Sequence, residues 1–169
     1  MATRSESAKA RKRAPEAKVL KYSLPDMASF EGKGLIRLAQ SDILFANVQL
    51  VKQGGDNALH SHAGMDGLWF VLKGRARFYG TLDDVVLAEL GQHEGIFIPR
   101  DFPYWFETAG AEPLEILQVE ALDRSVKNTR TDHKPMTAAT AEAHVFRMDG
   151  TKISQGYMTS VAGVEEEKG

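Results

Sequence analysis

Residues 54–74 read GGDNALHSHAGMDGLWFVLKG, and residues 95–106 read GIFIPRDFPYWF. Each stretch contains a run of aromatic and branched side chains, which suit a pleated β-strand. Glycines and prolines bound these runs, as they commonly do at turns. In the first stretch a single residue separates His60 from His62. Successive side chains on a strand point to opposite faces, so we expect both imidazoles on one face.

The same pattern continues on both sides of these stretches. Between residues 35 and 122, short apolar runs are separated by Gly, Asp and Pro. The runs are LIRLA, ILFANVQLV, LWFVLKG, RARFYG, VVLAEL, GIFIP, YWFE and LEILQVEAL. Many short strands with closely spaced turns predict a sandwich or a barrel rather than alternating strands and helices. We therefore expect an all-β barrel domain over residues 22–122.

Composition narrows the class of protein. The chain has 169 residues, of which 43% are hydrophobic and 26% charged, as is usual for a globular domain. It contains no cysteine, which excludes disulfides, thiolate metal ligands and a cysteine nucleophile. It has no apolar run of about 18 residues, so no membrane span is expected. We expect a cytoplasmic protein.

The two ends differ from the centre in charge. Residues 1–21 carry seven Lys or Arg and two Glu, and lack the apolar segment of a secretory signal. This stretch predicts a flexible basic arm, and nucleic acid is not an expected partner because no aromatic residue is interleaved with the basic ones. Residues 123–169 predict a C-terminal extension, with a short helix in TAATAEAHVF and an acidic tail, EEEKG.

The two quoted stretches resemble the two sequence motifs of the cupin superfamily. The first motif is a Gly, five residues, His-x-His, three or four residues, Glu, six residues and Gly, and it aligns with Gly54, His60, His62 and Gly74. The second is a run similar to I-P-x-G-x-P-H-W-F, matched here by residues 98–106. The motifs cover residues 54–107, and the flanking strands extend the resemblance to 35–122. It implies a double-stranded β-helix, or jelly-roll barrel, often paired as a homodimer.

Several motif positions carry other residues. The resemblance implies a metal held by two His and a Glu from the first motif and a His from the second. The Glu position is Gly67 here, and the His position is Tyr104. Asp66 stands one residue before the Glu position, and a one-residue offset turns a strand side chain to the other face. The glycines expected in the second motif are replaced by His93 and Asp101.

Two interpretations of the altered site remain open. In the first, the chain is a metal-dependent enzyme acting on a small organic molecule, as an oxygenase, isomerase, decarboxylase or lyase. His60 and His62 would hold iron, zinc or copper, with Tyr104 as third ligand or as catalytic acid or base, and with Asp66 as a further ligand. In the second, the metal has been lost and the chain is a non-catalytic protein that binds a small molecule through the same side chains.

Further residues are candidates for the wall of a ligand site. Trp69 and Phe106 share faces with the motif residues at two-step spacing, and the alternative for both is ordinary core packing. Asn47 and Gln49 lie on one face of their strand, which points either into the barrel or to solvent. The row Arg75, Arg77 and Tyr79 is expected to point outward. His93 is expected at the far end of the barrel, and His133 and His144 fall in the C-terminal extension.

Overall fold

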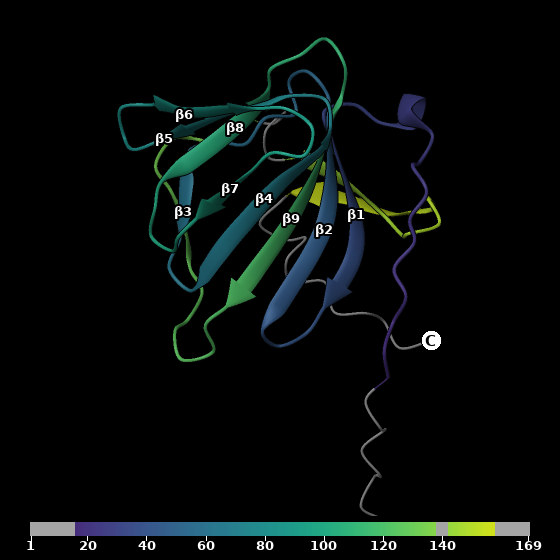
Figure 1. The fold of residues 1–169 in the computed structure, drawn as a ribbon, viewed down its shortest axis with the longest axis horizontal. Helices are drawn as coiled ribbons and strands as arrows, with labels where there is room; N and C mark the ends of the chain where they lie inside the picture. The colour runs from purple at the N-terminus through teal and green to yellow at the C-terminus, as the bar shows by residue number, and fades with distance from the viewer. Residues whose placement is uncertain (1–15, 138–141, 158–169) are drawn as a thin grey trace, which may run out of the picture.

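The computed structural model describes residues 16–137 and 142–157, and these form two β-sheets (Figure 1). The strands are β1 (Lys33–Gln40), β2 (Leu44–Val51), β3 (His60–His62), β4 (Met65–Lys73), β5 (Ala76–Gly80), β6 (Val85–Leu90), β7 (Gly95–Ile98), β8 (Tyr104–Thr108), β9 (Leu114–Leu122), β10 (Arg130–Asp132), β11 (Glu142–Phe146) and β12 (Lys152–Tyr157). A short 3-10 helix, η1, spans Met27–Ser29. The expected all-β architecture is confirmed.

In both sheets, many neighbouring strands come from parts of the sequence that are far apart. The large sheet has the order β12-β11-β1-β2-β9-β4-β7, and the small sheet has the order β10-β3-β8-β5-β6. Neighbouring strands are antiparallel except β1 and β11, which are parallel. Figure 1 shows β4, β9, β2 and β1 side by side, with β5, β6 and β8 grouped apart from them. Both sheets include strands that follow Leu122, because β10 pairs with β3 and β11 pairs with β1.

The inner faces of the two sheets form the main core. Along β4 and β9 every second residue is buried, which is the period-2 pattern of a half-buried strand. Trp69 contacts Phe106, with ring centroids 4.9 Å apart, and Phe106 stacks on Phe78 at 5.0 Å. The rest of this cluster consists of Tyr104 and the aliphatic residues Val51, Val71, Ala76, Ile98, Leu114 and Ile116. One end of the barrel is therefore filled by side chains.

A second core lies on the outer face of the large sheet. There the segment before β1 packs Phe30 against Phe146, with ring centroids 5.3 Å apart. The Tyr22 hydroxyl donates to the Glu115 carboxylate on β9, which ties this segment to the sheet. Since the outer face is covered, the interior of β1 and β2 is buried on both sides.

The expected helix within residues 137–146 is wrong where the structure describes it. Residues 142–146 form strand β11, and residues 138–141 lie outside the described part. β11 sits between β12 and β1, so both of its edges are hydrogen-bonded within the sheet. Ala143 and Val145 pack with Leu35, while Phe146 joins the outer core. The predictions for residues 1–15 and for the tail EEEKG also lie outside the described residues.

Two glycines of the first motif hold left-handed backbone conformations. Gly54 has φ of 81° in the turn before β3, and Gly74 has φ of 84° between β4 and β5. A side chain at Gly74 would also meet the Pro113 carbonyl oxygen at 3.0 Å. His93 and Asp101, which replace glycines of the second motif, are left-handed too, with φ of 69° and 62°. Both positions therefore adopt the left-handed conformation that suits glycine, although neither residue is a glycine.

Within the described residues, no helix is long and apolar enough to cross a membrane.

Candidate functional site

Strands β3 and β8 bring the two histidines and Tyr104 together inside the barrel. His60 lies directly across the ladder from Tyr104, and the centroids of their rings are 4.8 Å apart. The rings of His60 and His62 meet edge to face at 5.0 Å. His60 and Tyr104 are only 3% and 4% exposed. The expected cluster of two imidazoles and a phenol is therefore present in the interior.

Burial keeps both imidazoles neutral. The pKa of His60 is well below its usual range because of burial, the nearby Arg130 and its neighbour His62. Burial and Arg130 also lower the pKa of His62, to about 4. The Nδ1 atom of His60 lies 2.7 Å from the Ala58 carbonyl oxygen, to which it donates. Nε2 of His60 then carries the lone pair, and Nδ1 of His62 has no hydrogen-bond partner among the described residues.

Tyr104 remains a phenol rather than a phenolate. Burial and the charge of Glu120 both raise the pKa of Tyr104 far above its usual value. In this environment the hydroxyl keeps its proton at any physiological pH. The Tyr104 hydroxyl can therefore donate a hydrogen bond.

Glu120 is the site residue that the sequence analysis missed. It lies on β9 directly across the ladder from Gly67, the position where the first motif expects its Glu. Opposite residues of an antiparallel pair point to the same face. The Glu120 side chain thus faces the interior next to the position that lacks one. Burial raises the pKa of Glu120 from its usual 4.5 to about 7.

A chain of amide side chains holds Glu120 in place. Gln118 donates through Nε2 to the Glu120 carboxylate. The Gln118 Oε1 atom accepts from Asn47 at 2.9 Å and from Gln49 at 2.7 Å. Asn47 and Gln49 are 2% and 1% exposed, so their shared face points into the barrel. They act on the site through Gln118 and Glu120.

Comparison with solved structures identifies the fold. An uncharacterized conserved protein with a double-stranded β-helix domain, from Klebsiella pneumoniae, is 17% identical, with a TM-score of 0.54 and coverage of 71% of this chain and 100% of that chain. The conserved SPY1581 protein of unknown function from Streptococcus pyogenes is 19% identical, with a TM-score of 0.50 and coverage of 70% and 99%. An RmlC-like cupin from Shewanella frigidimarina is 14% identical, with a TM-score of 0.46 and coverage of 61% and 86%.

The chain has the cupin fold. The double-stranded β-helix expected from the two motifs is thereby confirmed. No protein-family model matches the sequence, and no curated protein matches it. At these identities the likeness establishes the fold alone, so the chemistry of the site has to be argued from its own residues.

The cupin barrel contains a narrow pocket at its polar end. Its polar side chains are those of His62, Tyr104 and Glu120, and Gly67 lines the pocket beside them. The remaining lining is apolar, from Met65, Ile98, Pro99 and Phe102. The pocket has room for about one water molecule. It can therefore take one small polar group but not, in this form, a whole substrate of ordinary size.

Other expected site residues lie elsewhere. The Asp66 carboxylate accepts from the Arg100 backbone N–H at 2.9 Å and pairs with the Arg100 guanidinium at 3.5 Å. It occupies the face opposite to Gly67 and Trp69, as strand alternation requires, so it is not positioned as a metal ligand. Trp69 and Phe106 are 1% and 0% exposed, and they are core residues outside the pocket lining.

The residues present do not fit the four-ligand metal centre expected for a cupin. Of its four ligands only His60 and His62 remain. Among residues 16–137 and 142–157, no three His, Asp or Glu side chains are grouped so that they could hold a metal ion. Glu120 faces the pocket that His62 lines, yet it does not complete such a group.

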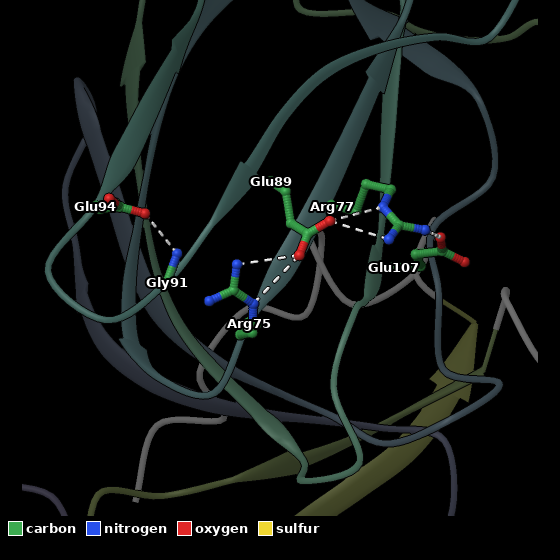
Figure 2. A network of polar contacts seen from close by, with 6 residues as sticks. All are labelled: Arg75, Arg77, Glu89, Gly91, Glu94 and Glu107. Carbon is green, nitrogen blue, oxygen red and sulfur yellow. Dashed lines mark hydrogen bonds and ion pairs between the residues drawn. The ribbon is translucent and has the colours of Figure 1, made fainter.

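Outside the pocket, the row of Arg75, just before β5, and Arg77 and Tyr79 on β5 points outward as expected. Figure 2 shows the Glu89 carboxylate between Arg75 and Arg77, each with an N–O distance of 3.0 Å. Arg77 also pairs with Glu107 at 3.5 Å. These ion pairs lie on the outer face of the small sheet. They have no part in the interior site.

The remaining histidines also lie apart from the pocket. The Nε2 atom of His133 is 2.9 Å from the Ser61 hydroxyl, on the face of β3 opposite to His60 and His62. His144 packs beside Phe30, with ring centroids 5.7 Å apart, in the outer core. His93 lies in the turn before β7.

Proposed function

We propose that the chain is a small-molecule-binding cupin whose ligand is held by hydrogen-bonding side chains rather than by the metal centre usual for the fold. The observation that carries the proposal is the pocket where His62, Tyr104 and Glu120 meet opposite Gly67. An imidazole, a phenol and a carboxyl group line this pocket together, and burial is the main influence on the protonation state of each. Small-molecule sites are typically apolar cavities with a few placed polar groups, which is the composition found here.

The three groups supply complementary hydrogen bonds. Tyr104 donates through its hydroxyl, and a neutral His62 offers one donor and one acceptor nitrogen. Glu120, with its pKa near 7, is a donor below neutral pH and an acceptor above it. A ligand therefore inserts one small polar group between these side chains. The apolar rim made by Met65, Ile98 and Phe102 contacts its remainder.

Titrations followed by nuclear magnetic resonance test this binding function. Isotope-labelled protein, free of affinity tags, is titrated separately with formate, formamide, imidazole and ethylene glycol. Binding in the pocket is expected to shift the resonances of Gly67, Tyr104 and Glu120. Tyr104→Phe removes the hydroxyl alone and should weaken binding, whereas the exposed Glu112→Gln should leave it unchanged. If none of the four compounds shifts the pocket resonances, the proposal is wrong.

The metal-dependent enzyme expected from the sequence is the second candidate. One observation favours it: the His60 Nδ1 contact with the Ala58 carbonyl, since metal-ligating histidines commonly donate their other ring N–H to a carbonyl. His60, His62 and Tyr104 would then hold iron, zinc or copper. Mass spectrometry of untagged wild type and His60→Ala decides between the candidates. Near-stoichiometric metal in wild type that is lost in the variant would establish the metal site.

A further inference from the structure

Strand β10 adds a charged residue to the edge of the site. It pairs with β3 in register, so that Arg130 lies opposite His62 and Asp132 lies opposite His60. Directly opposite residues on an antiparallel ladder point to the same face, with Cβ atoms about 5 Å apart. The Arg130 side chain therefore lies on the inner face beside the imidazole that lines the pocket.

The Arg130 guanidinium is only partly engaged. Its Nε and Nη2 atoms both contact Oδ1 of Asp132 at 2.8 Å. Nη2 also lies 3.5 Å from the Met136 sulfur. Nη1 has no hydrogen-bond partner among the described residues. The side chain is 19% exposed, so the charge is largely withdrawn from solvent.

The electrostatic environment of the pocket reflects this cation. Burial and then Arg130 lower the pKa of His62. Burial raises the pKa values of Tyr104 and Glu120, and the charge of Arg130 opposes both rises. The charged groups that interact with Arg130 are Asp132 on its own strand, Glu120 across the barrel and the buried Lys33 on β1. Glu120 loses its charge below about pH 7, and burial lowers the pKa of Lys33 to about 7. A positive potential combined with neutral hydrogen-bonding groups favours an anion over a cation of similar size.

The geometry points to Arg130 as the residue that selects a small carboxylate as the ligand of this pocket. Guanidinium and carboxylate groups form strong charge-assisted hydrogen bonds, which the unengaged Nη1 can supply. The Tyr104 hydroxyl donates to the same group from within the pocket. Arg130 can select a ligand only if the barrel binds one, so this assignment depends on the proposed function.

Formate and formamide form a matched pair of probes for the assignment. The two compounds are similar in size and differ in charge. Formate is the smallest carboxylate, which suits the narrow pocket. Each is titrated into the full chain at pH 6.5 and constant ionic strength, with sodium chloride as the reference anion. We expect formate to shift the pocket resonances at a concentration at least about tenfold lower than formamide does.

Variants separate the role of Arg130 from a general effect of charge. Arg130→Gln should weaken formate binding at least about tenfold and leave formamide binding unchanged. Arg130→Lys keeps the charge but not the planar fork, and should fall between wild type and Arg130→Gln. Arg124→Gln is the control, because Arg124 pairs with Asp42 at an exposed site. Amide spectra of each variant report whether it is folded.

The outcomes distinguish this assignment from the binding function itself. Equal affinities for formate and formamide, or a folded Arg130→Gln that binds formate as wild type does, would overturn the role of Arg130 and leave a ligand site in place. If neither compound shifts the resonances of Gly67, Tyr104 or Glu120, then the assignment fails together with the proposed pocket function.

Discussion

Replacing Glu120 by Gln should change how the stability of the protein depends on pH. Gln has the shape of Glu and can still accept from Gln118, but it does not titrate. In the folded protein the pKa of Glu120 rises from 4.5 to about 7. At about 1.36 kcal/mol per pKa unit, this rise corresponds to about 3 kcal/mol. The full energy opposes folding only above about pH 7, where the carboxyl group is ionised in both the folded and the unfolded protein.

The sign of the effect follows from which state loses its proton first. As the pH rises from 4.5, the unfolded chain releases the Glu120 proton while the folded protein keeps it. Stability therefore falls with rising pH until the folded carboxyl also ionises near pH 7, and this contribution is then constant. His62 acts in the opposite direction: its folded pKa of about 4 lowers stability as the pH falls from 6.5 to 4. The difference between Glu120→Gln and wild type isolates the carboxyl contribution.

Urea unfolding between pH 4.5 and 8 measures this difference, and fluorescence of the buried Trp69 reports the transition. The unfolding free energy of Glu120→Gln minus that of wild type should grow by about 3 kcal/mol between pH 4.5 and 7, then remain level. Glu112→Gln, at an exposed site, should show no such growth. A Glu120→Gln difference that is flat across this range would refute the buried, neutral carboxyl group on which the site depends.

Three further predictions concern packing, backbone and surface. Phe106→Ala should lower the unfolding free energy by about 3–5 kcal/mol in urea titrations, because the ring is fully buried; a loss below about 1 kcal/mol would contradict its core role. Asp101→Gly should raise stability by about 0.5–1 kcal/mol, because φ of 62° strains a residue with a Cβ; lower thermal stability would refute this reading. Asp66→Asn should change stability by about 1 kcal/mol or less and leave pocket binding unchanged, because its ion pair is on the surface; weaker formate binding would place Asp66 in the site.

Much of the fold could be predicted because it depends on local patterns. The apolar runs with their Gly and Pro boundaries correspond to strands, and Gly54 and Gly74 hold the left-handed turns that the first motif requires. The failed helix shows the limit of local pattern. Residues 142–146 favour a helix by composition, but β11 is enclosed between β1 and β12, and pairing within the sheet overrides that preference.

The site could be predicted only in part, for a related reason. His60 and His62 are close in sequence, and Tyr104 stands in a recognisable motif, so their cluster was expected. Glu120 belongs to neither motif, and its position across from Gly67 depends on the register between β9 and β4. The one local signal was its spacing: Gln118 and Glu120 continue the inward row of Leu114 and Ile116 at two-step intervals. A carboxylate on an inward row indicates a site.

The central claim is that this barrel has exchanged its metal ligands for hydrogen-bonding groups, and a zinc titration tests it most directly. A Cβ at Gly67 would meet nothing closer than the Trp69 Nε1 atom at 3.4 Å, so the missing Glu can be restored there. Wild type and the double variant Gly67→Glu, Tyr104→His are each titrated with zinc by calorimetry. We expect weak binding by wild type and at least about 100-fold tighter binding by the folded double variant. Tight, stoichiometric zinc binding by wild type, or no gain in the double variant, would contradict the account.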